Sequence, residues 1–117
     1  MKRLILFIVA TVSVSLAQAS ADLDLRNADR VSCTTVGRGT FNLVDLQSEK
    51  PRYVRSASNL INVLQVEKNT MIYVHPNGSI ETLEFGEAQY SDGQLSGYRV
   101  KLSEDSGESQ TMRCSVF

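Results

Sequence analysis

The side chains best suited to chemistry in this sequence are a single histidine, two cysteines and a series of glutamates. His75 comes directly before the turn sequence Pro76-Asn77-Gly78. A histidine that acts as a general base needs a nucleophile and an orienting group within hydrogen-bond reach. The sequence contains no Gly-x-Ser-x-Gly motif that would supply such a nucleophile. We therefore expect His75 to be a solvated turn residue in a protein that has no catalytic residues and is not an enzyme.

The glutamates suggest a second kind of catalysis, the paired carboxylates of glycoside hydrolysis. Glu81, Glu84 and Glu87 follow one another at three-residue intervals. On a strand this spacing places adjacent members on opposite faces, so we expect charged strand-edge positions instead of a catalytic pair. One histidine with scattered carboxylates makes no zinc site, and the turn acids lack the spacing of a calcium loop. We expect no metal and no cofactor.

These residues lie in a series of short β segments that are separated by turn sequences. Asn77-Gly78 and Asp92-Gly93 suit the positive φ angles of tight hairpin turns, and Gly37-x-Gly39 breaks an earlier strand. The expected strands are 31–36, 41–46, 70–75, 79–85, 87–90, 95–102 and 110–117.

Apolar and polar residues alternate clearly in the later strands. Tyr98, Val100 and Leu102 alternate with Arg99 and Lys101. This period of two means one buried face and one solvated face, as in an antiparallel sheet. The pattern predicts a mainly β fold, a small antiparallel meander that forms a barrel or a sandwich.

The stretch 58–68 is compatible with two structures. Its apolar residues recur at helical spacing, with Ser58 placed to cap the first turn, yet Leu60, Leu64 and Val66 also share one face of a strand. Its β-branched residues favour a strand. A short helix here would cover one end of the sheet.

Cys33 and Cys114 are the only cysteines. In an exported chain of this size they predict one disulfide, which would tie the first expected strand to the last. Closing a loop of about 80 residues stabilises a fold by about 4–5 kcal/mol in the chain-entropy description. Without a Cys-x-x-Cys pair, a redox role is not expected.

Residues 1–19 have the three parts of a secretory signal peptide. A cationic start precedes an apolar run from Leu4 to Leu16, and small residues follow at Ala17 and Ala19. The run is too short to cross a bilayer as a helix, so we expect cleavage after Ala19 or Ala21 and no membrane span in the mature chain. We expect a periplasmic or secreted protein.

The expected domain organisation is simple. After a signal peptide at 1–19 we expect a polar N-terminal tail or one weak helical turn at 20–30, then a single β-rich domain at 31–117. Removal of the signal peptide also removes two basic residues, which leaves a net charge of about −3. An acidic balance of this kind argues against a nucleic-acid partner.

The layout of the chain resembles that of small bacterial periplasmic β-barrels, including the C-type lysozyme inhibitors. The shared features are Val31-Ser32-Cys33 in the first strand, Ser96-Gly97-Tyr98 later on, and a cysteine near the end. In that inhibitor family a long strand region follows the serine–glycine motif, whereas only 20 residues follow Gly97 here. We therefore do not assign the family's binding loop to this chain, and the resemblance does not make the chain a member of the family.

These observations predict an exported, non-catalytic binding or inhibitory module. Loops on a rigid sheet commonly carry function, so the expected contact surfaces are three turns. Their candidate residues are Gly37, Arg38 and Gly39; His75, Pro76, Asn77 and Gly78; and Asp92 and Gly93. The alternative is a small carrier with a cavity for an apolar ligand inside a β-barrel, so the expected partner is a protein or a small apolar molecule.

Overall fold

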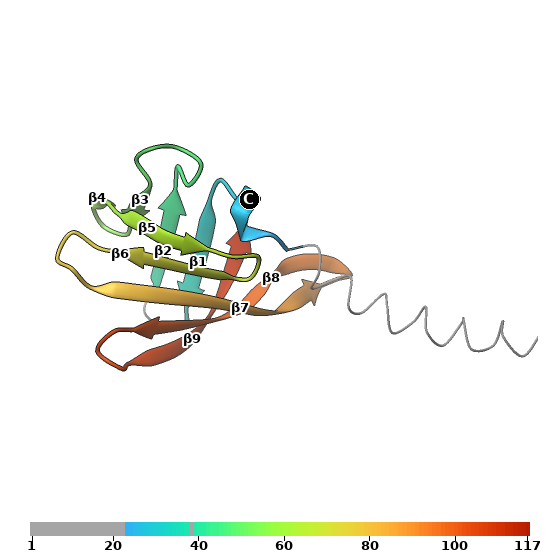
Figure 1. The fold of residues 1–117 in the computed structure, drawn as a ribbon. Coiled ribbons are helices and arrows are strands. Elements are labelled where there is room, and N and C mark those ends of the chain that lie inside the picture. The colour runs from blue at the N-terminus through green and yellow to red at the C-terminus, as the bar shows by residue number, and fades with distance from the viewer. Residues whose placement is uncertain (1–22, 38) are drawn as a thin grey trace, which may run out of the picture.

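The computed structural model describes residues 23–37 and 39–117 as one nine-stranded antiparallel sheet preceded by a single 3-10 turn (Figure 1). The mainly β fold expected from the alternation is confirmed. The expected signal peptide and the candidate contact residue Arg38 lie outside the described residues. The elements are η1 (Leu25–Asn27), β1 (Val31–Thr35), β2 (Gly39–Val44), β3 (Arg52–Val54), β4 (Ser58–Leu60), β5 (Asn62–Val66), β6 (Thr70–Val74), β7 (Ile80–Ser91), β8 (Gln94–Glu104) and β9 (Ser109–Val116).

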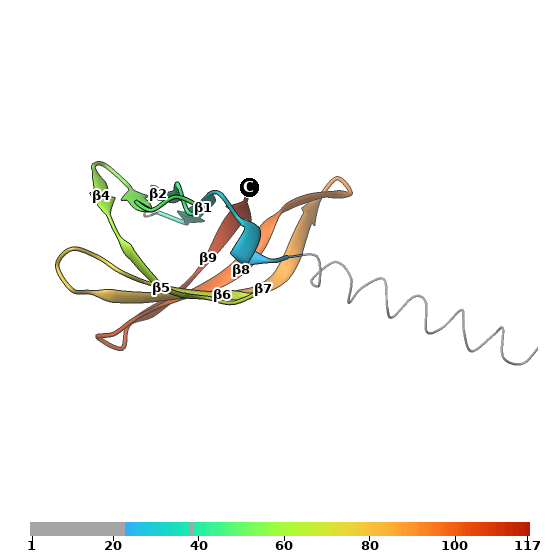
Figure 2. The same ribbon diagram turned by 45° about the horizontal axis from the view of Figure 1, so that its top comes forward.

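The sheet is a meander that curls into a nearly closed barrel. Its strand order is β4-β3-β2-β1-β9-β8-β7-β6-β5, so the first and last strands of the chain pair with each other. The two edge strands, β4 and β5, are consecutive in the chain and are separated by Ile61 alone. Ile61 is buried, and its N–H donates to the carbonyl of Pro51 at 3.0 Å. Figure 2 shows β4 leading from the layer of β1 and β2 into the layer of β5 and β6.

The stretch 58–68 forms strands, which was the alternative favoured by its β-branched residues. A sharp change of direction at Ile61 and a β-bulge between Val63 and Gln65 interrupt the strand period. Because of these two interruptions, Leu60 and Leu64 point to solvent while Ile61 is buried. The helical spacing of the apolar residues therefore reflects two short strands that meet at a corner.

The core lies inside the barrel and follows the predicted alternation. Tyr98, Val100 and Leu102 on β8 are buried, and Arg99 and Lys101 between them are exposed. Neighbouring strands contribute matching inward rows because their register places inward residues opposite one another. The other core residues on these neighbours are Met71 and Tyr73 on β6, Leu83 and Phe85 on β7, and Met112 and Cys114 on β9.

The predicted disulfide between Cys33 and Cys114 is confirmed. The two residues are direct partners in the β1–β9 pairing, with Cα atoms 4.1 Å apart and both side chains fully buried. β8 approaches this bridge closely at Gly97, where an added Cβ would lie 2.8 Å from the carbonyl oxygen of Cys114. The disulfide therefore fastens the pairing that joins the N-terminal and C-terminal halves of the meander.

For the segment 20–30 the sequence predicts either a polar tail or one weak helical turn. The structure shows the turn, η1. Leu23, Leu25 and Ala28 are buried, and the two leucines belong to the core. The N–H of Leu25 donates to the carbonyl of Lys68, in the turn that precedes β6. The described part of this segment therefore packs on the barrel and covers one end of it, which a polar tail would not do.

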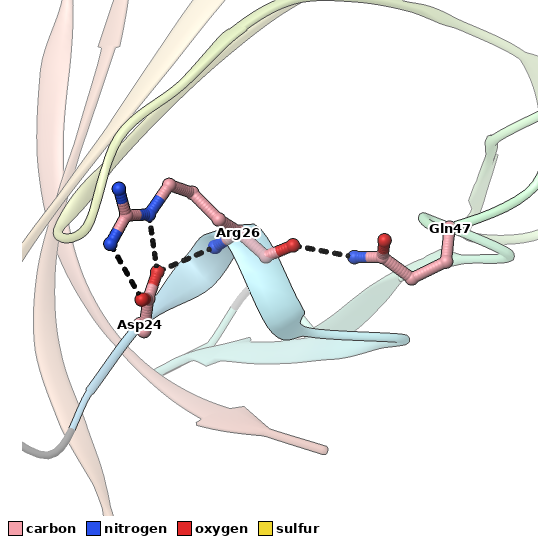
Figure 3. A network of polar contacts seen from close by, with 3 residues as sticks. All are labelled: Asp24, Arg26 and Gln47. Carbon is pink, nitrogen blue, oxygen red and sulfur yellow. Dashed lines mark hydrogen bonds and ion pairs between the residues drawn. The ribbon is translucent and has the colours of Figure 1, made fainter.

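Side-chain contacts hold this turn at both ends (Figure 3). Asp24 caps η1 by accepting from the backbone N–H of Arg26 at 3.0 Å, and its carboxylate also pairs with the Arg26 guanidinium at 2.8 Å. The Gln47 amide donates to the carbonyls of Arg26 and Ala28 at 2.9 and 2.8 Å. These bonds satisfy backbone carbonyls at the end of η1, where no intrahelical partner exists.

Candidate functional site

Three neighbouring strands carry inward rows that end in ionisable side chains at the same end of the barrel. The row on β6 passes through Met71 and Tyr73 and continues to His75 just beyond the strand. The row on β7 begins with Glu81 before Leu83 and Phe85, and the row on β8 ends with Glu104 after Val100 and Leu102. Register pairs Tyr73 with Glu81 and Glu81 with Glu104, so these groups lie side by side. We call this end of the barrel, with His75, Glu81 and Glu104, the mouth.

His75 is held in place, and this corrects the expectation of a solvated turn histidine. Its Nε2 lies 2.6 Å from a carboxylate oxygen of Glu81, and the two side chains are only 17% and 13% exposed. The rings of Tyr53 and Tyr73 contact the imidazole edge-on, with centroids 4.6 and 5.5 Å away. The backbone N–H of His75 donates to Ser79, so the hairpin turn also fixes the residue. A histidine that makes these contacts is part of the barrel wall.

Glu81 likewise faces the barrel interior, where a charged strand-edge residue had been expected. Glu84, three residues later, is exposed on the outer face, so the expected opposite orientation of these two glutamates is confirmed. The carboxylate next to Glu81 comes instead from the neighbouring strand, as Glu104. Residue spacing within one strand does not reveal a pair that forms across two strands.

Two tyrosines face these carboxylates from the interior. Burial raises the pKa of Tyr73 above its usual range, and the nearby Glu81 carboxylate raises it further. Glu81 is the register partner of Tyr73. Even so, the fully buried hydroxyl of Tyr73 has no hydrogen bond to any residue that the structure describes. Partial burial also raises the pKa of Tyr53; Arg55 opposes this shift, whereas Glu81 and Glu104 add to it. Both hydroxyls therefore stay protonated at neutral pH.

An open cleft of about 470 Å³ lies at the mouth, between the β6–β7 turn and the β8–β9 turn. Its acidic lining residues are Glu81, Glu104 and Asp105, and Asn59 contributes an amide. Neither lysine nor arginine is among the described residues that line the cleft. Within 23–37 and 39–117 no three His, Cys, Asp or Glu side chains are grouped to hold a metal ion. The cleft thus offers hydrogen-bond acceptors and negative charge to a ligand that carries donors.

The structure separates the three predicted contact turns. His75, Pro76 and Asn77 line the cleft, with Gly78 in the same turn at φ +91°. Asp92 and Gly93 form the turn at the far end of the twelve-residue strand β7. The described glycines of the remaining turn, Gly37 and Gly39, connect β1 to β2 and both have positive φ. The turns at 75–78 and 92–93 therefore lie at opposite ends of β7.

The β7–β8 hairpin projects beyond its neighbours, as the upper right of Figure 2 shows. The pairing of β6 with β7 covers residues 80–84, and the pairing of β9 with β8 begins at Tyr98. The hairpin from Gln89 to Leu95, which we call the arm, is thus outside both pairings. Tyr90 and Leu95 face each other across the arm and are 54% and 51% exposed. The arm therefore exposes two apolar side chains on a two-stranded hairpin.

Comparisons of the chain with protein-family models, with curated proteins and with solved structures found no match. In the described part of the chain, no helix has the length and apolar character needed to cross a membrane.

Proposed function

We propose that the protein is an exported, non-catalytic binding or inhibitory module of the periplasm or extracellular space, and that the mouth is its binding site. The observation that carries this proposal is the common end of three inward rows, where His75, Glu81 and Glu104 replace apolar residues. Ionisable groups in half-buried positions are costly unless they are paired, and stability alone would favour apolar residues there. Such groups around an open cleft are typical of binding sites.

Export is supported by the disulfide and by the N-terminal sequence. A buried Cys33–Cys114 bridge suits an oxidising compartment, because cytosolic thiols are kept reduced. Residues 1–19 carry the charge and hydrophobicity pattern of a secretory signal. Both observations are consistent with a protein that functions outside the cytosol.

A non-catalytic role is supported by the surroundings of His75. Its Nε2 contacts Glu81, two tyrosine rings hold the imidazole edge-on, and no hydrogen bond joins it to a serine, threonine or cysteine side chain of the described residues. A general base must reach a proton on its substrate or nucleophile. The contacts of His75 position it as a fixed wall of the cleft, which suits recognition.

The arm favours a protein as the partner over a small apolar ligand. Exposed aromatic and aliphatic side chains on a projecting hairpin can be inserted into a partner's pocket. In contrast, the alternative of an apolar-ligand carrier receives no support, because buried side chains fill the barrel interior and the cleft at the mouth is polar.

Affinity capture with the full chain, expressed with its own N-terminal segment, tests this proposal. We expect the wild-type protein and the control Glu84→Gln to retain one stoichiometric protein from extracts of the envelope and medium. Glu81→Gln should capture much less of that protein, because it removes the inward-facing carboxylate of β7, whereas Glu84→Gln removes an outward-facing carboxylate of the same strand. Equal capture by Glu81→Gln and wild type, or recovery of lipid alone, would contradict the proposal. Mass spectrometry of the purified protein should show the loss of 19 or 21 N-terminal residues.

A further inference from the structure

Building on the proposed function of the mouth, we infer that its ligand is an organic cation, a guanidinium or ammonium group. The first observation is the direct pairing of Glu81 with Glu104 on β7 and β8, where both side chains face inward. Like charges directly opposite one another in a sheet destabilise it. His75 contacts one of the two carboxylates, Glu81. A cationic group placed between the two carboxylates would offset their repulsion.

The second observation is the buried hydroxyl of Tyr73. This residue is fully buried, and its hydroxyl has no hydrogen bond to any described residue; its register partner on β7 is Glu81. Unsatisfied buried polar groups are rare in folded proteins and call for a specific explanation. Tyr73 lies on β6, whereas the two paired glutamates lie on β7 and β8, so this observation is separate from the first. A cation that fixes the Glu81 carboxylate at the mouth would leave one carboxylate oxygen free to accept from this hydroxyl.

The remaining lining of the cleft matches the same chemistry. Asp105 adds a third carboxylate and Asn59 adds an amide oxygen, whereas no lysine or arginine of the described residues lines the cleft. An anionic ligand would meet uncompensated repulsion. A metal ion is a poorer match, because no described cluster has the geometry to coordinate one. A guanidinium or ammonium group on a flexible stem fits both the donors required and a cleft of about 470 Å³.

Two sources can provide this cation: an arginine or lysine side chain of a partner protein, or a free polyamine. A titration followed by NMR distinguishes them, with Nα-acetyl-arginine amide and spermidine as probes and Nα-acetyl-glutamate amide as the anionic control. We expect saturable shifts at His75 and the neighbouring backbone amides with a cationic probe and none with the anion. Stronger binding of the arginine probe assigns the cation to a partner's side chain, and stronger binding of spermidine assigns it to a free polyamine.

Variants locate the cation within the mouth. Glu104→Gln should raise the dissociation constant at least tenfold, and the outward control Glu84→Gln should leave it unchanged. Tyr73→Phe should weaken binding while the thermal midpoint of unfolding stays the same or rises, which separates recognition from folding. The inference is overturned if no cationic probe saturates, or if Glu84→Gln weakens binding as much as Glu104→Gln.

The outcomes also separate this inference from the proposed function. If Glu81→Gln loses the captured partner but cationic probes do not bind, the mouth is a binding site and the inferred ligand class is wrong. If cationic probes bind as expected while Glu81→Gln still captures the partner, the inference holds and the proposed role of the mouth in partner binding fails.

Discussion

The two ends of the barrel are built from the same strands but end in different side chains. At one end, the 3-10 turn η1 lays Leu25 against the core, and the chain hydrogen-bonds across the opening to Lys68 and Gln47. At the other end, just beyond β6, His75 and its carboxylate neighbours line an open cleft. We call the first end the covered end. Between the two ends the inward rows change from apolar to ionisable.

The difference shows how a small barrel can separate stability from recognition. The covered end buries apolar area and satisfies backbone carbonyls, and both effects stabilise the fold. The mouth places two carboxylates opposite each other and leaves the Tyr73 hydroxyl without a good partner, and both features destabilise it. Changes at the two ends should therefore have opposite effects on stability.

The largest expected effect is at the covered end, with Leu25→Ala. Leu25 is 1% exposed, so its truncation should lower the free energy of unfolding by about 2–5 kcal/mol through lost burial and the cavity left behind. Chemical denaturation measures this change. Leu95→Ala, on the half-exposed arm, is the control and should change stability by less than about 0.5 kcal/mol. Equal effects of the two substitutions would mean that η1 does not contribute to the core.

A smaller effect is expected from Gln47→Ala, which removes the polar part of the same cover. The Gln47 amide donates to two carbonyls, and one of these bonds is partly buried. Because water can replace part of this bonding, we expect a loss of about 1 kcal/mol. Hydrogen exchange of the amides in 23–30 should accelerate, while amides around His75 keep their protection. Acceleration at both ends would show that they do not behave separately.

The mouth should respond in the opposite direction. Glu104→Gln removes one of two facing carboxylates, so it should raise the free energy of unfolding by a few tenths to about 1 kcal/mol. Thermal unfolding at low ionic strength gives the sharpest measurement, because salt screens the repulsion. Glu84→Gln, on the outer face, should show no such gain. Destabilisation by Glu104→Gln would mean that this carboxylate has a structural role.

The sequence predicted the fold because local signals for it were consistent. Period-two alternation around Tyr98, Val100 and Leu102 identified the buried face of β8, and the disulfide followed from the two cysteines alone. The edges at 58–68 were harder, because a corner at Ile61 and a bulge in β5 disturb the period. The burial of Leu25 was missed because this residue lies among charged neighbours.

The candidate site was harder to predict because it forms across strands. Extending the alternation by two residues from Leu102 would have placed Glu104 on the inner face, so that part of the signal was present. Its position beside Glu81 depends on the register of β7 with β8, which a single sequence does not specify. For the same reason, His75 had the local sequence of a solvated turn although its contacts come from Tyr53 and Glu81.

The smallest effect tests whether the covered end depends on pH through Asp24. The Arg26 guanidinium, which bonds to the Asp24 carboxylate, is the main cause that lowers its pKa from 3.8 to about 2. Because the folded-state pKa is depressed, the stabilisation is fully present above about pH 4 and is lost as the pH falls through about 2. Asn at position 24 still caps η1 but carries no charge. We therefore expect Asp24→Asn to unfold at a slightly lower temperature than wild type at pH 6, with the difference shrinking between pH 4 and pH 2. Equal unfolding temperatures at pH 6 would show that capping, which Asn retains, and not the ion pair, is what Asp24 contributes to the covered end.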